Sequence, residues 1–124
     1  GKLAFYKRLD CVIDQANNYT VKGFKKGDSL RMNGFVTANE NIADLGGAKL
    51  ARMAYDSWAR NHSKEMGIAG FTPRQMFWLN FANVWCMKYS VWWLRDLILN
   101  YRYAPSEYRV NNAVRNNHQF AKDF

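Results

Sequence analysis

The chain lacks any long hydrophobic run. Its 124 residues contain no stretch of about 18 apolar residues, and a helix needs about 20 of them to cross a membrane. The pattern of a secretory signal peptide is also missing, as expected of a piece from the interior of a longer precursor. We therefore expect no membrane segment within the chain and, at this length, a single domain over residues 1–124.

Acidic residues are scarce relative to basic ones. Eighteen lysines and arginines stand against ten aspartates and glutamates, which gives a formal net charge of +8. A basic balance can indicate a nucleic-acid-binding protein. The positive residues are scattered, however, and the sequence has neither a glycine-rich RNA-binding motif nor a zinc knuckle. We expect a solvated basic surface and no nucleic-acid partner.

Cysteine is limited to Cys11 and Cys86, so at most one internal disulfide is possible. The sequons Asn18-Tyr19-Thr20 and Asn61-His62-Ser63 permit N-glycosylation of Asn18 and Asn61 in a secretory compartment. Because sequons are frequent by chance, they support an extracellular location only weakly.

Large apolar residues, by contrast, are abundant. Hydrophobic residues make up 48% of the chain and aromatic residues 16%, with 5 Trp, 7 Tyr and 8 Phe. A short chain buries a small fraction of its surface. We therefore expect part of this apolar surface to contact a partner, which can be a second copy of the chain.

The sequence predicts an all-α fold. Apolar residues recur at helical spacing, and the expected helices cover residues 2–19, 38–61, 72–89, 91–101 and 116–124. Residues 22–36 contain Gly23, Gly27 and Gly34 among charged residues, which indicates a loop. Thr72-Pro73 is a helix start signal. Pro105 is expected to end the helix that precedes it.

Two carboxylates stand near the start of the longest expected helix. Glu40 and Asp44 are four residues apart, so both side chains point from one face of that helix. We expect Ile42, Ala43 and Gly46 to bury this face, where a cation has to compensate the acids. One interpretation is a metal ion with imidazoles held by the second acid. The other is an N-terminal capping cluster that favours the helix dipole.

The same helix is expected to bury an apolar stripe. Its members recur once per helical turn and are Ile42, Ala43, Gly46, Leu50, Met53, Ala54 and Trp58. Gly46 and Gly47 are expected to let a neighbouring helix approach closely, and Asn41 is expected to be a surface amide.

Four segments together resemble the neprilysin family of zinc endopeptidases. Residues 40–47 resemble its Glu-Asn-Ile-Ala-Asp-x-Gly-Gly motif, and residues 71–86 resemble Phe-Thr-Pro-x-Gln-x-Phe-Phe-x-x-Phe-Ala-x-x-Trp-Cys. Residues 104–111 are similar to Ser-Pro-x-x-Phe-Arg-Val-Asn, and residues 120–124 to Phe-x-x-x-Phe. The segments occur in the family's order and spacing, so the resemblance covers nearly the whole chain.

The resemblance implies a helical C-terminal subdomain of a zincin-like metallopeptidase, which hydrolyses peptides when complete. It implies that Glu40 is the third zinc ligand and that Asp44 holds a ligand histidine through its second nitrogen. Arg109 matches the arginine that binds a peptide carbonyl of the substrate. An extracellular or membrane-anchored ectodomain is the implied location.

Tyr103 departs from the family pattern. It stands where the family has a histidine that stabilises the oxyanion of the reaction. A tyrosine hydroxyl can also donate a hydrogen bond there, but it is neutral and longer. Asn39, where the family usually has glycine, is a milder departure.

The family's His-Glu-x-x-His motif is absent, since His62 and His118 are isolated. A catalytic zinc needs about three protein ligands, and only Glu40 is supplied. We therefore expect the chain alone to be inactive and to hold no zinc, with an upstream N-terminal half as its partner. The alternative is a pseudopeptidase that serves as a secreted binding or structural module.

The resemblance also implies partners for the cysteines. Cys11 matches a cysteine that pairs near the extreme C terminus of family members, and Cys86 one that pairs with the N-terminal part. Neither partner lies in this sequence, so the two cysteines are not expected to bond to each other.

Overall fold

The computed structural model describes residues 1–25, 29–62 and 65–124. Within these residues the chain is mostly helical, as predicted, with one small antiparallel strand pair. The elements are α1 (Lys2–Asn17), β1 (Thr20–Val21), β2 (Leu30–Arg31), α2 (Gly34–Ala59), α3 (Pro73–Val84), α4 (Val91–Asn100), α5 (Ser106–Arg115) and α6 (His118–Asp123). Thr20 lies opposite Arg31 in the pair, and Val21 lies opposite Leu30.

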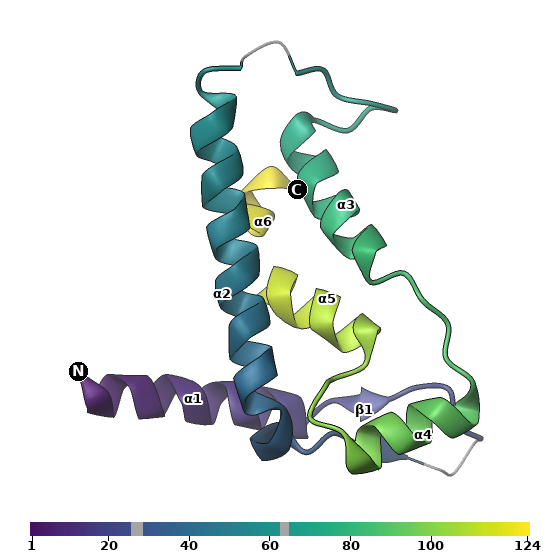
Figure 1. Ribbon diagram of the computed structural model, residues 1–124. Coiled ribbons are helices and arrows are strands. Elements are labelled where there is room, and N and C mark those ends of the chain that lie inside the picture. Colours follow the sequence, from purple (N-terminus) through teal and green to yellow (C-terminus); the bar gives the residue numbers. More distant parts are fainter. Residues whose placement is uncertain (26–28, 63–64) are drawn as a thin grey trace.

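Helix α2 runs along one side of the molecule, and the other elements are arranged around it (Figure 1). α1 lies across its N-terminal end, α5 packs against its side, and α6 packs on α3 and α5. The apolar core lies at the foot of the molecule, where α1, the strand pair, α4 and the start of α5 meet. It contains Ala16, Val21, Met32, Leu94, Ala104 and Tyr108.

The loop predicted from residue 22 to residue 36 begins as expected after Val21, but its second half is wrong. It contains β2 and the first turn of α2, which starts at Gly34 instead of Ala38. The start is fixed by side-chain amides: Asn33 accepts from the Val36 N–H at 3.1 Å, and Asn17 accepts from the Gly34 N–H at 2.7 Å. A Cβ at Gly34 would collide with the Ile13 carbonyl oxygen, so glycine here allows α1 and α2 to cross. Gly27, which was expected in the same loop, lies outside the described residues.

The predicted apolar stripe of α2 is also wrong. Leu50, Met53 and Trp58 are 66%, 50% and 46% exposed, and a Cβ at Gly46 or Gly47 would meet open space. The face that packs inward is instead small and polar, and its buried members are Gly34, Thr37, Ala38, Asn41, Ala48 and Arg52. Periodicity failed here because the buried positions carry polar groups that find partners inside the molecule.

Asn41 shows how such a polar group is accommodated. Expected at the surface, it is 1% exposed and donates to Thr37 Oγ1 at 3.0 Å. Thr37 in turn donates to the Asn33 carbonyl at 3.0 Å. This chain of hydrogen bonds offsets the cost of burying the amide.

The helices of the second half differ in their bounds from the prediction. α3 starts at the predicted Thr72-Pro73 signal with a capping box: Thr72 Oγ1 accepts from the Gln75 N–H, and Gln75 Oε1 from the Thr72 N–H. It ends at Val84 and does not reach residue 89. The sequence did not predict helix α5, because Pro105 indicates the end of the preceding helix; in the structure it also stands immediately before the first residue of α5.

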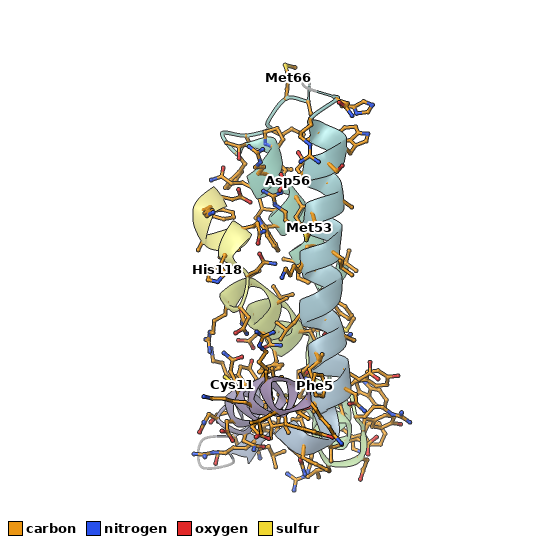
Figure 2. All side chains as sticks on the ribbon, turned by 90° about the vertical axis from the view of Figure 1, so that its left-hand side faces the viewer. Phe5, Cys11, Met53, Asp56, Met66 and His118 are labelled. Atoms are coloured by element: carbon orange, nitrogen blue, oxygen red, sulfur yellow. The ribbon has the colours of Figure 1, made fainter. Side chains whose placement is uncertain are left out.

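A buried ion cluster holds the C-terminal helix against α2 and α3. Arg52, with a side chain 2% exposed, donates to both Asp123 carboxylate oxygens, and its Nη1 forms an ion pair with Asp56. Trp78 Nε1 donates to Asp123 at 2.8 Å and Gln75 Nε2 to the Asp123 carbonyl at 2.7 Å. Figure 2 shows Asp56 on α2 level with α3.

Candidate functional site

The candidate site is built where α2 and α5 face each other. Asp44, in the third turn of α2, and Arg109, in the first turn of α5, form a two-point ion pair. Arg109 Nε donates to Asp44 Oδ2 and Nη2 to Oδ1, both at 2.6 Å. The two side chains are only 13% and 17% exposed. These hydrogen bonds, and after them the charge of Asp44, raise the pKa of Arg109 despite its partial burial.

Two aromatic side chains stand close to the Arg109 guanidinium. Its Cζ lies 3.9 Å from the centre of a Trp85 ring and 6.0 Å from that of Tyr103. Trp85 caps the C-terminal end of α3, and Tyr103 lies between α4 and α5. The structure therefore brings Asp44, Tyr103 and Arg109 together from three different parts of the chain.

Glu40 lies one turn before Asp44 and is half-buried. Its negative charge contributes to the raised pKa of Arg109. Its carboxylate makes no side-chain hydrogen bond or ion pair within residues 1–25, 29–62 and 65–124, so its oxygens are free to accept a ligand. The capping interpretation is wrong, because α2 starts at Gly34, six residues earlier, and Asn33 caps it.

The donor set is incomplete for zinc. In the part of the chain that the structure describes, no three histidine, cysteine, aspartate or glutamate side chains lie close enough together to hold a metal ion. Glu40 has the right chemistry for one zinc ligand, since a carboxylate without another partner is a good oxygen donor. The residues present therefore fit one position of a zinc site and leave the others to be supplied.

The remaining predicted residues lie elsewhere. Cys11 and Cys86 are both exposed and are not bonded to each other, and Figure 2 shows Cys11 on α1 at the foot of α2. Asn18 and Asn61 are exposed, and Asn18 Nδ2 donates to the Asp14 carbonyl at 3.0 Å. Ser63, the third residue of the second sequon, lies outside the described residues.

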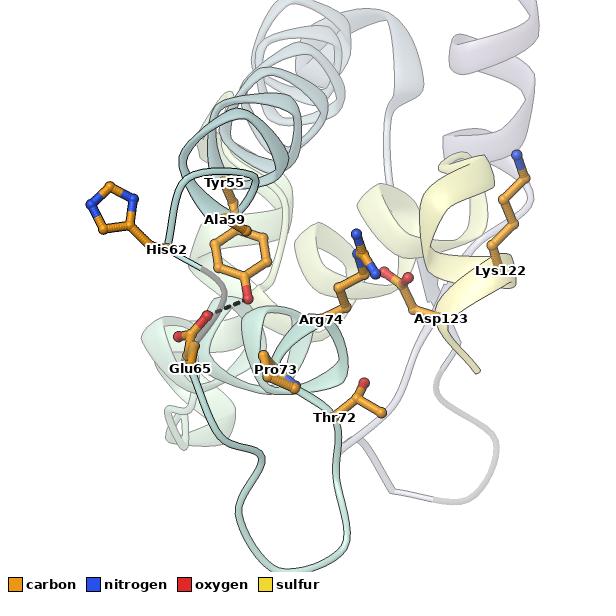
Figure 3. Close-up of a pocket in the computed structure, with 9 residues that line it drawn as sticks. All are labelled: Tyr55, Ala59, His62, Glu65, Thr72, Pro73, Arg74, Lys122 and Asp123. Carbon is orange, nitrogen blue, oxygen red and sulfur yellow. Dashed lines mark hydrogen bonds between the residues drawn. The ribbon is translucent and has the colours of Figure 1, made fainter.

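A separate hollow of about 380 Å³ lies at the other end of α2. Figure 3 shows it between Tyr55 of α2, the start of α3 and Asp123 of α6, with His62 also among the residues that line it. The Tyr55 hydroxyl donates to Glu65 at 2.6 Å. Burial and this hydrogen bond raise the pKa of Tyr55 to about 12. None of the predicted site residues lines the hollow, so the candidate site is not there.

The sequence signature of peptidase family M13 matches residues 2–124. Neprilysin-2 of Drosophila melanogaster is 40% identical over 123 residues, which is 98% of this chain and 15% of that protein. An endothelin-converting enzyme homolog of Locusta migratoria is 37% identical over 98% of this chain and 16% of its own length. Human endothelin-converting enzyme 1 is 33% identical over 98% of the chain and 15% of its own length.

Solved structures of zinc metalloproteases also resemble this chain. The open state of the zinc metalloprotease Zmp1 of Mycobacterium tuberculosis matches with a TM-score of 0.88 and 26% identity, over 98% of this chain and 19% of that one. The structure of Zmp1 in complex with an inhibitor matches with a TM-score of 0.84 and 28% identity, over 98% of this chain and 18% of that one. The architecture is thus a helical part of the zinc metalloprotease fold.

The chain belongs to peptidase family M13, the neprilysin family. This confirms the resemblance and the all-α fold class predicted from the sequence. The chain spans between 15% and 19% of the full length of these relatives. No helix among its described residues is both long and apolar enough to cross a membrane.

Sequence reasoning missed one member of the site and one of its bonds. Trp85 lies within the helix expected over residues 72–89, and nothing in the sequence predicted its place over Arg109. The pairing of Asp44 with Arg109 was also missed, because the two are 65 residues apart. The available signal was an acid and an arginine in two separate motifs, but motif spacing carries no information on which helix faces meet.

Proposed function

We propose that this chain is the C-terminal part of a neprilysin-like zinc metalloendopeptidase and that it supplies one zinc ligand and the substrate-binding side of the active site. The observation that carries the proposal is the meeting of Glu40, Asp44, Tyr103 and Arg109 across α2, α5 and the loop before α5. An upstream segment would supply the missing zinc ligands, and the zinc they hold would bind the attacking water.

Arg109 is the group we assign to substrate binding. A guanidinium has five N–H donors, and Asp44 takes one from Nε and one from Nη2. The donors left over include both hydrogens of Nη1. They can bind a peptide carbonyl at the edge of the guanidinium that faces away from Asp44, and the arginine stays charged at any working pH.

Glu40 is the group we assign to zinc. Bound zinc would supply a Lewis acid and an activated water. The carboxylate of Glu40 would complete a set of two imidazoles and one oxygen ligand. We further propose that Asp44, whose oxygens each retain a lone pair after accepting from Arg109, also orients one of those imidazoles.

Tyr103 is the group we assign to oxyanion stabilisation. Its side chain is 44% exposed and its ring lies near Arg109. When a peptide carbonyl is attacked, negative charge develops on its oxygen, and a phenol O–H can donate to it. Because the phenol is neutral, it stabilises this charge less than an imidazolium would.

The second candidate function is a pseudopeptidase, a secreted binding or structural module. The observation that favours it is Tyr103 itself, a departure at a reacting position. In either case we propose an extracellular or ectodomain location, an upstream half of the peptidase as partner and Cys86 as a link to it. Cys11 would pair with a C-terminal cysteine, and Asn18 and Asn61 would be glycosylation sites.

The experiment is a cleavage assay of the complete gene product on a quenched peptide, with and without a zinc chelator. We expect zinc-dependent cleavage, a loss of about 10² in kcat for Tyr103→Phe and recovery in Tyr103→His. Glu40→Ala should abolish cleavage. Absence of cleavage by the wild type together with cleavage by Tyr103→His would establish the pseudopeptidase. Zinc-independent cleavage would reject the peptidase assignment.

A further inference from the structure

Helix α5 begins after a residue whose side chain cannot cap it. Pro105 stands at the N-cap position and makes no side-chain hydrogen bond. The first N–H groups of a helix have no partner within the helix, and a side chain at the N-cap commonly accepts from one of them. Ser106 carries the first of these groups and is only 4% exposed. Its N–H therefore needs an acceptor from elsewhere in the chain.

Tyr89 supplies that acceptor from 17 residues earlier. The Ser106 N–H donates to the Tyr89 phenol oxygen at 3.3 Å. The same phenol oxygen lies 2.7 Å from Ser106 Oγ, in a hydrogen bond that either hydroxyl can donate. Tyr89 thus takes the place of the capping residue of α5, although it lies in the segment between α3 and α4.

The place of Tyr89 is itself fixed on two sides. Its ring packs against the apolar core. The next residue, Ser90, caps α4: its Oγ accepts from the Trp93 N–H at 3.2 Å, and its carbonyl accepts from the Leu94 N–H at 2.9 Å. A tyrosine side chain has few rotatable bonds between its backbone and its hydroxyl. The Tyr89 hydroxyl is therefore a fixed point to which the start of α5 is attached.

The capped turn lies between two residues that we assign to the reaction. Tyr103 stands three positions before Ser106, and Arg109 stands three positions after it. Arg109 belongs to the same first turn of α5, since its N–H donates to the Pro105 carbonyl at 3.0 Å. A change in where this turn begins would move both side chains relative to α2.

We propose that Tyr89 is a positioning residue whose hydroxyl sets the start of α5 and thereby places Tyr103 and Arg109 around one substrate carbonyl. The inference rests on the proposed function of those two residues. Tyr89 needs no contact with the substrate for this role, because it acts through the cap. The oxyanion donor and the carbonyl-binding cation then keep one separation while the substrate is bound and during the reaction.

Tyr89→Phe keeps the ring in the core and removes the hydroxyl of the cap. Tyr103 acts only in the transition state, whereas Arg109 binds the carbonyl in both states, so we expect kcat to fall and KM to rise. A misplaced donor keeps part of its effect, so kcat should fall about tenfold, against about 10² for Tyr103→Phe. Ser106→Ala should cost less than Tyr89→Phe, because the backbone N–H still donates to the phenol oxygen.

A double-mutant cycle in the complete gene product separates positioning from a general loss of folded protein. If Tyr89 acts through Tyr103, Tyr89→Phe lowers kcat in the wild type and has little further effect on kcat in Tyr103→Phe. Equal factors in the two backgrounds, or unchanged kcat and KM in Tyr89→Phe, would overturn the proposal. Tyr6→Phe is the matched control: it removes the same atom from a tyrosine that is 47% exposed on α1, and both constants should stay unchanged.

A second measurement does not depend on activity. In the 124-residue chain labelled with nitrogen-15, NMR reads the Ser106 amide and the Arg109 Nε–H. Tyr89→Phe should move both resonances and speed hydrogen exchange at Ser106, whereas Tyr6→Phe should move neither. A moved Ser106 amide with an unmoved Arg109 Nε–H shows a cap without positioning and overturns the inference. Movement of both resonances, with no cleavage by the complete product, rejects the proposed function and keeps the positioning of Arg109.

Discussion

Asp44 accepts hydrogen bonds from Nε and Nη2 of Arg109, both at 2.6 Å, across 65 residues of sequence. One ion pair thereby fixes α5 against α2 and sets the direction of the side chain that we assign to substrate binding. Because Glu40 lies one turn before Asp44 on α2, the same ion pair also brings Arg109 close enough to Glu40 to be affected by its charge. Stability and the geometry of the site therefore depend on the same two residues.

The first prediction concerns the strength of this pair. Asp44→Ala should lower the free energy of unfolding by about 3 kcal/mol, because it leaves a largely buried guanidinium without its counter-charge. A cycle with Arg109→Ala should give a coupling energy of about 1–3 kcal/mol. Urea unfolding followed by circular dichroism measures both values. The control is Lys22–Glu107, whose side chains are 81% and 51% exposed and whose coupling should be below about 0.5 kcal/mol. Equal couplings in the two pairs would contradict the account.

The second prediction concerns the cluster at the C-terminal end. Asp123→Ala should cost about 3 kcal/mol, because Arg52 is then buried without its main partner. Asp14→Ala, an exposed acid whose carboxylate makes no ion pair with described residues, should cost little. Replacing both partners, with Arg52→Met and Asp123→Leu, should recover most of the loss. A double variant as unstable as Asp123→Ala would show that packing, and not charge, dominates here.

The third prediction is a dependence on acid pH. The hydrogen bond from Arg52, outweighing burial and aided by Arg74, lowers the pKa of Asp56 below its ordinary value. A carboxyl with a lowered folded-state pKa contributes stability above its unfolded pKa of about 3.9, and this contribution is lost as pH falls through the folded value. The wild type should therefore lose more stability below about pH 4 than Asp56→Asn does.

Chemical unfolding at a series of pH values measures this difference. Asp10→Asn is the control, since Asp10 is exposed on α1 and should leave the pH profile of the wild type unchanged. Parallel profiles for the wild type and Asp56→Asn would refute the assignment.

The fourth prediction is that the isolated chain self-associates. Several of its large apolar side chains are exposed, including Leu3 at 85%, Phe35 at 79% and Trp92 at 74%. Exposed surface of this kind is commonly covered in a symmetric oligomer, and the +8 charge should keep it soluble. Sedimentation at several concentrations is the measurement. A monodisperse monomer of 14.5 kDa at high micromolar concentration would contradict it.

Local signals predicted the helices better than the faces they bury. The Thr72-Pro73 start of α3 was read correctly, because a cap and a proline act within one turn. The start of α5 at Ser106 was not, because the same proline chemistry at Pro105 was used only to end a helix. Bounds set by a tertiary bond, as at Gly34 with Asn17, cannot be read from the neighbouring residues.

The motif residues of the site were predictable and their contacts were not. Spacing placed Glu40 and Asp44 on one helix face and the family resemblance suggested their roles, but the partner of Asp44 depends on how α5 crosses α2. The prediction of the inward face of α2 was wrong because two polar side chains are buried there. Asn41 bonds to Thr37 on the preceding turn of the same helix, and Arg52 bonds to Asp123 at the far end of the chain. An apolar stripe is a guide to burial only where the core is apolar.

The central claim is that Glu40 completes a zinc site whose other ligands lie outside this chain. Metal analysis after equilibrium dialysis tests it directly, on the complete gene product and on the 124-residue chain. We predict one zinc per molecule in the complete product, loss of that zinc in Glu40→Ala, retention in Glu107→Ala, and no tight zinc in the chain alone. A complete product that holds its zinc equally well with Glu40→Ala, or a chain that binds one zinc at sub-micromolar affinity by itself, would contradict the account.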